Sequence, residues 1–171
     1  YLLMKKKPAA FLDRDGVINY DYGYIYKYKD FKLRPGVIKG LQYLKERKFK
    51  IFIITNQSGI ARGLFTEKDL ASLHSKLKKD LLKNKIKLDE IRYSPYHPSG
   101  IIKKFTKRHK SRKPDNLMVK QILRKWPTDI KRSFMIGDKL SDQKCAKKSR
   151  LYFEYAKKNF YYQVKNILKI K

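Results

Sequence analysis

Short runs of apolar residues alternate with helical patterns along the 171-residue chain. A run of consecutive apolar residues is typical of a strand that is buried on both faces of a sheet. The sequence predicts five such strands, at residues 9–12, 50–54, 91–93, 133–136 and 151–155. Longer segments separate them, and in these segments apolar residues recur every three or four positions.

These longer segments carry helix signals. A first helix is predicted at residues 36–48. Thr66 is a candidate N-cap for a second helix, whose apolar stripe consists of Leu70, Leu73, Leu77 and Leu81. Pro114 is typical of the first turn of a third helix, and Ser141 is a candidate N-cap for a fourth. A last helix is predicted at residues 160–168.

Strands that alternate with helices indicate a parallel sheet with helices on both faces. We therefore expect an open, Rossmann-like α/β fold in which residues 1–171 form one domain without a large cap domain. Ligands of such sheets bind beyond the carboxyl ends of the strands, near the point where the strand order reverses. The residues that directly follow each strand are therefore the candidates for a functional site.

Polar residues follow three of the predicted strands: residues 13–16 are DRDG, residues 55–59 are TNQSG and residues 137–139 are GDK. Asp13 and Asp15 are two positions apart, which on an extended segment places both carboxylates on one side. Two carboxylates so close repel each other unless a cation lies between them or one is protonated. Asp138, at another strand end, completes an all-oxygen set that suits Mg²⁺.

This arrangement predicts phosphoryl transfer. Asp13 is the candidate nucleophile, which would form a phospho-aspartate, and Asp15 is the candidate acid and base. Magnesium would screen the negative charges of the carboxylate and of the phosphate that it attacks. Gly16 allows a tight turn close to the phosphate. The alternative, that DRDG is only a turn, is weakened by the polar residues at two other strand ends.

The chain is strongly basic, because 44 Lys and Arg against 15 Asp and Glu give a formal net charge of +29. Such a field attracts phosphates of any kind, in nucleic acids or in small metabolites. The lysines are spread along most of the chain, so a general lysine bias is the competing explanation.

The single cysteine, Cys145, excludes an internal disulfide and a Cys-rich zinc site. No apolar run reaches the roughly 20 residues of a membrane span. We therefore expect a cytoplasmic protein that does not associate with membranes, and we expect it to be a monomer.

Four segments resemble, in order, the four motifs of the haloacid dehalogenase superfamily of phosphatases: FLDRDGVIN, IITNQSGIARG, SRKP and MIGDKLSD. The longer similarity is to the branch that contains D-glycero-D-manno-heptose-1,7-bisphosphate 7-phosphatase and histidinol phosphatase. It extends from about residue 8 to about residue 146. It weakens after that point, where the glycine that often follows the fourth motif is absent.

The resemblance implies a role for each motif residue. Asp13 would be the nucleophile and Asp15 the acid and base. Asp13, Asp15 and Asp138 would hold magnesium, Asp15 through its backbone carbonyl, and Thr55 and Lys113 would steady the transferring phosphoryl group. The substrate-binding positions would be Arg14, Asn19, Tyr20, Asp21, Tyr22, Asn56, Gln57, Ser58, Arg112 and Lys139. A hydroxyl, an amide and two cations would supply the preorganised positive field that this transfer needs.

Two substrates compete within this branch. The heptose enzyme serves the synthesis of ADP-heptose for lipopolysaccharide, and the histidinol enzyme serves histidine synthesis. The segments IARGLFTEKDL and DYGYIY resemble the heptose enzymes, so we expect a small phosphorylated sugar as substrate. Residues 91–114 contain eight Lys or Arg and no acidic residue, which suits a second substrate phosphate, although most of these lysines are expected to be ordinary solvated surface.

Many members of the family carry a structural zinc, held by a CPHH-like turn and a CxCRKP-like turn. The corresponding positions here are Ser94, Tyr96, His109 and Ser111. Neutral Ser and Tyr are poor zinc ligands, so only His109 is suitable, and the neighbouring His97 does not restore a set of four. We therefore predict that structural zinc is absent. The third histidine, His74, is predicted to be a surface or packing residue.

A nucleic-acid protein is the strongest hypothesis outside metabolism. Positive charge together with 13% aromatic residues could form a basic stacking surface, and related superfamily members dephosphorylate polynucleotide ends. No DNA-binding motif stands out, so we expect nucleic acid to bind only non-specifically, through charge. A polynucleotide 3′-phosphatase is the alternative activity.

Overall fold

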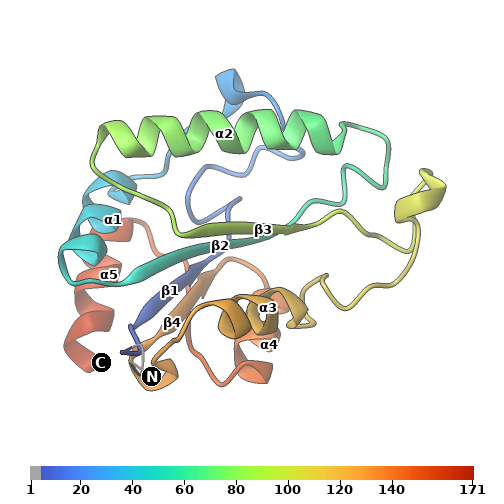
Figure 1. Ribbon diagram of the computed structural model, residues 1–171. Coiled ribbons are helices and arrows are strands. Elements are labelled where there is room, and N and C mark those ends of the chain that lie inside the picture. Colours follow the sequence, from blue (N-terminus) through green and yellow to red (C-terminus); the bar gives the residue numbers. More distant parts are fainter. Residues whose placement is uncertain (1–4) are drawn as a thin grey trace.

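The computed structural model describes residues 5–171, which form a five-stranded sheet flanked by helices (Figure 1). Neighbouring strands are parallel, in the order β3-β2-β1-β4-β5. The strands are β1 (Ala9–Leu12), β2 (Lys50–Asn56), β3 (Glu90–Ser94), β4 (Phe134–Gly137) and β5 (Tyr152–Tyr155). The helices are α1 (Val37–Glu46), α2 (Glu67–Lys83), α3 (Leu117–Lys125), α4 (Leu140–Lys148) and α5 (Phe160–Ile170). The predicted open α/β fold is therefore confirmed.

The central strands contribute to both faces of the sheet. In β1, Ala9 and Phe11 belong to one apolar cluster, whereas Ala10 and Leu12 belong to another. Successive residues of a strand alternate between faces, so a run of four apolar residues supplies two cores at once. β1 and β4 are buried throughout. Continuous apolar runs therefore mark these strands in the sequence.

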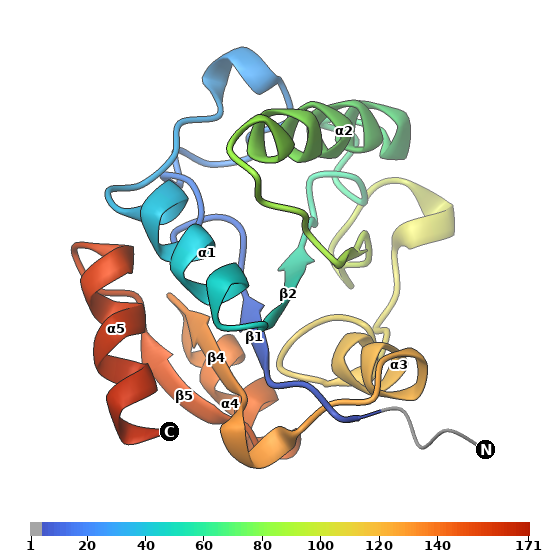
Figure 2. The ribbon, with the colours of Figure 1, turned by 60° about the vertical axis from the view of Figure 1, so that its left-hand side comes forward.

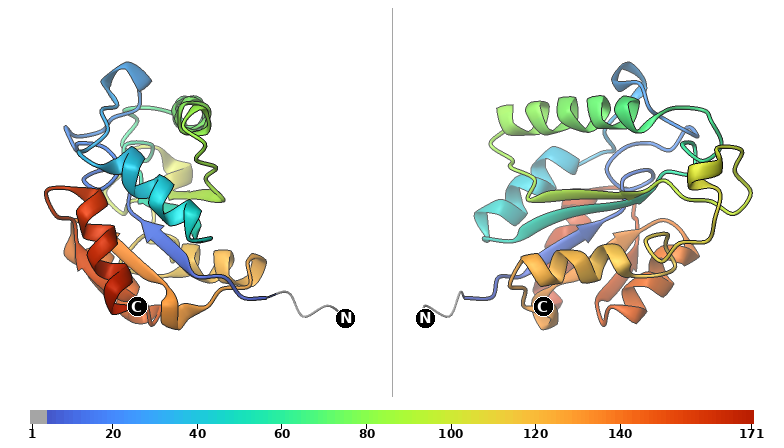
Figure 3. Two further views of the ribbon diagram at one scale, coloured as in Figure 1. Left: turned by 90° about the vertical axis from the view of Figure 1, so that its left-hand side faces the viewer. Right: turned by 45° about the vertical axis from the view of Figure 1, so that its right-hand side comes forward.

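Helices cover both faces of the sheet, as predicted. α1, α2 and α5 pack in the cluster that contains Ala10 and Leu12, whereas α3 and α4 pack in the cluster that contains Ala9 and Phe11. Figures 2 and 3 show α1 and α5 side by side on the first face, with α3 and α4 across the sheet. The sheet is thus the middle layer of three.

The predicted start of the third helix is wrong. α3 begins at Leu117 rather than at Pro114. The residues between them form a turn, in which the N–H of Asp115 donates to the carbonyl of Arg112 at 3.0 Å. A hydrogen-bonded turn takes the place of the first helical turn, so proline does not mark N1 here.

The predicted cap of the fourth helix is also wrong. α4 begins at Leu140, with Lys139 at the N-cap, and Ser141 lies inside the first turn. The side chain that accepts from the free N–H groups is Asp142, which bonds the N–H of Asp138 at 3.1 Å and that of Lys139 at 3.0 Å. The carboxylate of Asp142, in the first helical turn, thus accepts the hydrogen bonds that a hydroxyl group at the N-cap was predicted to accept.

The other helix signals are confirmed. Thr66 caps α2 by accepting from the N–H of Asp69 at 3.1 Å, and the Asp69 carboxylate accepts from the N–H of Thr66 at 2.8 Å. β5 and α5 form beyond residue 146, where the family resemblance weakens.

The two longest connections contain no large inserted domain. Residues 13–36 contain the 3₁₀ helix η1 (Tyr28–Asp30), and residues 95–116 contain η2 (Lys103–Phe105). A third 3₁₀ helix, η3 (Ile130–Arg132), precedes β4. Within residues 5–171, no helix has the length and apolar character needed to cross a membrane.

Gly40 lies where α1 packs against α5. A Cβ atom at this position would be 2.4 Å from Cδ1 of Phe160 and 3.2 Å from Cα of Tyr161. Replacing a helical glycine by alanine normally stabilises a protein by about 0.5–1 kcal/mol, but overpacking a core costs roughly 1–3 kcal/mol. We therefore expect Gly40→Ala to lower the free energy of unfolding by about 1–2 kcal/mol, measured by urea denaturation.

Phe160→Leu provides the matched control, because the smaller side chain relieves the clash. The loss of stability in the Gly40→Ala/Phe160→Leu double variant should be smaller than the sum of the two single losses. A Gly40→Ala protein as stable as the parent would contradict the close packing of α1 and α5.

Candidate active site

The polar residues that follow β1 and β4 meet in the middle of the sheet. β1, β2 and β3 succeed one another towards one edge, and β4 then returns to the other side of β1. The strand order therefore reverses between β1 and β4, which is where open α/β sheets bind ligands. Asp13 follows β1 and Asp138 follows β4, and the N–H of Asp13 donates to the carbonyl of Ile136 at 3.0 Å. A pocket of about 320 Å³ opens at this point.

The structure brings most of the predicted site residues to this pocket. Eight of them line it: Asp13, Asp15, Thr55, Asn56, Ser58, Arg112, Lys113 and Lys139. An adjoining pocket of about 170 Å³ adds Asp21 and Gln57. Tyr20 and Tyr22 line neither pocket, and their exposed rings stack on each other with centroids 5.9 Å apart. The prediction that these two tyrosines contact substrate therefore has no support in their placement.

Lys113 is the cation at the centre of the site. It follows β3 in the chain, and only 2% of its side chain is exposed. Its Nζ lies 2.8 Å from Oδ1 of Asp13 and 2.6 Å from Oδ1 of Asp142, and it donates to the carbonyl of Ile54 at 2.8 Å. Burial lowers the pKa of Lys113, but the two carboxylates outweigh this effect and raise the pKa above its ordinary value. Lys113 therefore remains charged.

The loop that carries Lys113 is fixed by Asn56, the last residue of β2. The side-chain amide of Asn56 donates to the carbonyl of Lys113, and its oxygen accepts from the N–H of Lys113, both at 3.0 Å. This pair of hydrogen bonds holds one backbone unit in place, so the lysine enters the site from a fixed direction.

Three carboxylates, those of Asp13, Asp138 and Asp142, have oxygen atoms within 4.8 Å of one another. Burial raises the pKa of Asp13 to about 7, and Lys113 opposes this only in part. Burial also raises the pKa of Asp138, whose Oδ1 is buried without a hydrogen-bond partner in the described part of the chain. A nearby cation would therefore favour the ionised form of both carboxylates. They therefore fit a divalent ion with oxygen ligands, such as Mg²⁺.

The carboxylate of Asp142 binds the ammonium group of Lys113 and two backbone N–H groups rather than a metal ion. One of its oxygens contacts Lys113, and the other accepts from the N–H groups at the start of α4. Gly137 makes room for it, because a Cβ atom there would lie 2.2 Å from Cβ of Asp142. Asp142 is not among the predicted site residues. Its position in the first turn of the helix that directly follows Asp138 is a signal that could have revealed it, since a carboxylate there can accept from the free N–H groups of the helix start.

Hydrogen bonds from Arg14, Asn19 and Gln57 hold the carboxylate of Asp15 in place. Its Oδ1 accepts from Nε and Nη2 of Arg14, at 3.2 and 2.9 Å, and from Nδ2 of Asn19 at 2.9 Å. Its Oδ2 accepts from Nε2 of Gln57 at 2.9 Å. Burial raises the pKa of Asp15, but Arg14 and these hydrogen bonds outweigh it and hold the pKa below its usual value. The pKa of Asp15 is thus lowered whereas that of Asp13 is raised, and the hydrogen bonds to Asp15 favour its ionised form.

Arg14 and Asn19, which are predicted to bind substrate, line neither of the two pockets. Both side chains are fully buried. Neighbouring residues of an extended segment point to opposite sides, so Arg14 must face inwards when Asp13 and Asp15 face the pocket. There it meets His74, which is buried in α2 with Nε2 3.2 Å from Nη1 of Arg14. His74 therefore packs against a functional motif rather than lying on the surface.

Gly16 is required by both its conformation and its surroundings. Its φ angle is +85°, in the region that favours glycine. A Cβ atom at this position would lie 2.2 Å from Oδ2 of Asp138. Any side chain at this position would therefore displace one of the two carboxylates that fit a cation.

Three basic side chains gather at the rim of the pocket: those of Arg62, His97 and Arg112. Nη2 of Arg62 lies 3.2 Å from Nε2 of His97, and Arg112 donates to the carbonyl of Tyr96 at 3.4 Å. Burial lowers the pKa values of His97 and Arg112, and the neighbouring arginines lower them further. Nε of Arg62 is buried without a hydrogen-bond partner among residues 5–171. The two guanidinium cations held together in this way attract an anion. Arg62 was not predicted, although it belongs to the second motif.

The two turns that contain Ser94, Tyr96, His109 and Ser111 are joined by hydrogen bonds and stacking. Oγ of Ser94 lies 2.8 Å from Oγ of Ser111. Nδ1 of His109 accepts from the N–H of Ser111 at 3.1 Å and lies 2.7 Å from its Oγ. The rings of Tyr96 and His109 stack with centroids 4.0 Å apart. Since Nδ1 of His109 already accepts, the hydroxyl of Ser111 donates to it and that of Ser94 donates to Ser111.

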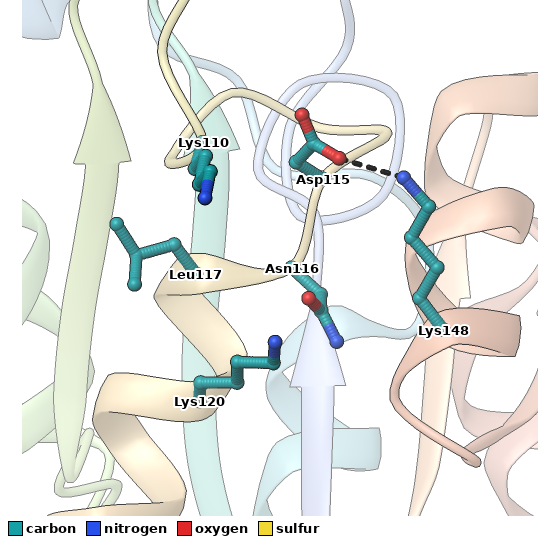
Figure 4. A pocket seen from close by; sticks show the side chains of 6 residues that line it. All are labelled: Lys110, Asp115, Asn116, Leu117, Lys120 and Lys148. Atoms are coloured by element: carbon teal, nitrogen blue, oxygen red, sulfur yellow. Dashed lines mark hydrogen bonds and ion pairs between the residues drawn. The ribbon is translucent and has the colours of Figure 1, made fainter.

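A further pocket of about 430 Å³ lies beside the first turn of α3 (Figure 4). It is lined by Lys110, Asp115, Asn116, Leu117, Lys120 and Lys148. Lys148 pairs with Asp115 at 2.6 Å, and Asn116 donates to Oγ of Ser149 at 3.2 Å. None of the strand-end carboxylates lines this pocket, so the smaller pocket with its convergent charged groups is the candidate active site.

Comparisons with known proteins show the family to which the chain belongs. The family model described as polynucleotide kinase 3 phosphatase matches residues 11–167. The D-glycero-beta-D-manno-heptose-1,7-bisphosphate 7-phosphatase of Rhodopseudomonas palustris is 39% identical over 142 residues, covering 83% of this chain and 79% of that protein. The enzyme of the same name from Escherichia coli K12 is 40% identical over 144 residues, covering 84% and 75%. The D-glycero-alpha-D-manno-heptose-1,7-bisphosphate 7-phosphatase of Photorhabdus laumondii is 40% identical over 137 residues, covering 80% and 75%.

Solved structures show the same architecture. A HAD-like phosphatase from Mesorhizobium loti superimposes with a TM-score of 0.86 at 26% identity, covering 96% of this chain and 85% of that one. The D,D-heptose 1,7-bisphosphate phosphatase of B. bronchiseptica, complexed with magnesium and phosphate, superimposes with a TM-score of 0.84 at 23% identity, covering 96% and 99%. The resemblance inferred from the four motifs is thus confirmed. The chain belongs to the polynucleotide kinase 3 phosphatase family, within the haloacid dehalogenase superfamily, and is a phosphomonoester hydrolase.

Proposed function

We propose that this protein is a magnesium-dependent phosphatase that removes one phosphate from a sugar bisphosphate through a phospho-aspartate. The observation that carries the proposal is the meeting of Asp13, Asp138 and Lys113 where the strand order reverses. One pocket lies beside all three features. They are a nucleophilic carboxylate, a cation site with oxygen ligands and a fixed positive charge. These are the components that phosphoryl transfer to a carboxylate requires.

In the proposed first step, an oxygen of Asp13 attacks phosphorus opposite the departing sugar oxygen. The bond from phosphorus to the sugar oxygen breaks, and Asp15, which must enter this step protonated on Oδ2, gives that oxygen its proton. In the second step, the ionised Asp15 takes a proton from water as the water attacks the phospho-aspartate, which frees phosphate and Asp13. Lys113 and Thr55 contribute positive charge and a hydroxyl beside the transferring group.

Magnesium would be held by Asp13, Asp138 and the backbone carbonyl of Asp15. When bound, it supplies the charge that screens the attacking carboxylate from the phosphate. Support comes from the raised pKa values of Asp13 and Asp138 and the unpartnered oxygen of Asp138. The B. bronchiseptica enzyme of similar fold was crystallised with this ion and phosphate.

The basic rim of Arg62, His97 and Arg112 supports a substrate with a second anionic group. A heptose bisphosphate carries a second phosphate that this rim would attract, whereas histidinol phosphate carries an ammonium group that it would repel. Relatives 39% and 40% identical are named for the bisphosphate. We therefore propose D-glycero-D-manno-heptose 1,7-bisphosphate as substrate, with loss of the 7-phosphate, in the synthesis of ADP-heptose for lipopolysaccharide.

A polynucleotide 3′-phosphate is the second candidate substrate. The family model that matches the chain is described by that activity, and a net charge of +29 favours nucleic acid. The pocket opens on a rim without an inserted domain in residues 95–116, so a bulky substrate is compatible with it. This candidate predicts fast phosphate release from a 3′-phosphorylated oligonucleotide.

We also propose that the loop between β3 and α3 needs no zinc. The support is the chain of hydrogen bonds from Ser94 through Ser111 to His109. This chain occupies Nδ1 of His109, the nitrogen that contacts Ser111. Stacking of Tyr96 on His109 adds a second link between the turns. These contacts join the same two turns that a metal would join.

Asp13→Asn should lower phosphate release by roughly three orders of magnitude or more, because an amide oxygen is a poor nucleophile. Inorganic phosphate release from the substrate panel, with and without added MgCl₂, measures the effect. Asp30→Asn is the matched control, since Asp30 is an exposed carboxylate in η1. Full activity of the Asp13→Asn protein would exclude a phospho-aspartate.

Arg62→Met should raise KM for the heptose bisphosphate by about 10-fold or more, because a charge-assisted hydrogen bond contributes roughly 1.5–3 kcal/mol. KM for p-nitrophenyl phosphate, which has no second phosphate, should change little. Arg108→Met is the control, as it removes the same charge from an exposed position in the loop between β3 and α3. Faster turnover of histidinol phosphate or of a 3′-phosphorylated oligonucleotide by the unaltered protein would reject the heptose substrate.

Elemental analysis of the purified protein should find much less than one zinc per chain. Incubation with EDTA should remove activity that MgCl₂ then restores, and it should leave the thermal unfolding midpoint unchanged, since no structural metal is lost. Stoichiometric zinc, or a midpoint that falls with EDTA and recovers only with zinc, would refute the metal-free loop.

A further inference from the structure

A buried hydrogen-bond chain links α2 to Asp15. His74, in the middle of α2, is 7% exposed, and its Nε2 lies 3.2 Å from Nη1 of Arg14. Arg14 in turn donates to Oδ1 of Asp15 through Nε and Nη2. The proposed reaction steps do not involve His74. A buried polar side chain whose partner holds a reacting group nevertheless influences where that group points.

The chemistry of Arg14 fixes the state of His74. An arginine side chain has donors only, so Nε2 of His74 accepts the hydrogen bond and the neutral ring carries its proton on Nδ1. Burial and the charge of Arg14 lower the pKa of His74 to about 3, so the ring stays neutral under ordinary conditions. The other guanidinium donors go to Asp15 and to the carbonyl of Ile25 at 2.9 Å. His74 therefore accepts from the one guanidinium nitrogen that neither of them uses.

The two oxygens of Asp15 have unequal surroundings. Oδ1 accepts three hydrogen bonds, two from Arg14 and one from Asn19, whereas Oδ2 accepts one from Gln57. The side chain lines the pocket and is 18% exposed. Oδ1 is thus an anchor with its lone pairs occupied. Oδ2 keeps the capacity to carry a proton towards the pocket.

We propose that His74 is a positioning residue for proton transfer by Asp15. By accepting from Nη1 it holds the guanidinium plane of Arg14, which anchors Oδ1 and leaves Oδ2 directed at the substrate. The inference rests on the proposed role of Asp15 as acid and base. It adds a residue of α2, outside the four motifs, to the machinery of the site.

Leaving-group dependence tests this role, because only a poor leaving group needs a proton from Asp15. The oxygen of an alkyl phosphate must be protonated as its bond to phosphorus breaks, whereas p-nitrophenolate leaves without a proton. The quantity to measure is kcat/KM, which reports the step in which Asp13 receives the phosphoryl group. The two substrates are p-nitrophenyl phosphate and the sugar phosphate that the unaltered protein hydrolyses fastest.

Three substitutions separate the hydrogen bond from the volume of the side chain. His74→Leu fills the space without an acceptor, and His74→Asn places its amide at the level of Nδ1, short of Arg14. His74→Gln places an amide oxygen near the position of Nε2 and can accept from Arg14. Urea denaturation of each variant shows whether the protein is folded at the assay temperature.

We expect His74→Leu and His74→Asn to lose about 10- to 100-fold in kcat/KM on the sugar phosphate, part of the 10²–10⁴ that a general acid contributes. On p-nitrophenyl phosphate the loss should stay within about threefold, and His74→Gln should be close to the unaltered protein on both substrates. Equal losses on the two substrates, or no loss on either, would overturn the positioning role while leaving the phosphatase proposal intact. A lack of activity of the unaltered protein on both substrates would instead reject the proposed function.

Discussion

The site depends on one buried cation. The ammonium group of Lys113 is enclosed by Asp13, Asp142 and the carbonyl of Ile54, at 2.6–2.8 Å. Transfer of an ammonium group out of water costs several kcal/mol, and only a complete set of partners offsets this cost. The partners come from the end of β1, from β2 and from the first turn of α4. Lys113 therefore ties three strand connections to one point, and loss of either carboxylate would leave the buried ammonium group with a single carboxylate partner.

The periodic signals of the sequence were sufficient for the fold and for the strand-end carboxylates. The four-residue run Ala9–Leu12 had to be a buried strand, and a parallel sheet then brings Asp13 and Asp138 together by topology alone. The start of α3 was predicted wrongly because a side chain from another strand fixes the backbone conformation before the helix. Asn56 holds the carbonyl and the N–H of Lys113, and no local pattern reports such a contact.

The site residues that the sequence did not reveal were missed for a common reason. Asp142, His74 and Arg62 act through partners that are distant in the chain, 29, 60 and 35 residues away respectively. Arg14, which the resemblance places among the substrate-binding positions, has a fully buried side chain. Alternation along an extended segment turns it inwards instead. Motif membership identifies the segment, but the direction of a side chain decides what it contacts.

Asp13 and Asp15 are both buried at the end of β1, yet their pKa values move in opposite directions. The difference follows from how their cations are shared. Arg14 pairs with Asp15 alone, whereas Lys113 divides its charge between Asp13 and Asp142. Asp13 is therefore incompletely compensated, and a further cation beside it would favour its charged form. The sharing of Lys113 thus gives the nucleophile more to gain from a bound metal than Asp15, whose charge Arg14 already compensates.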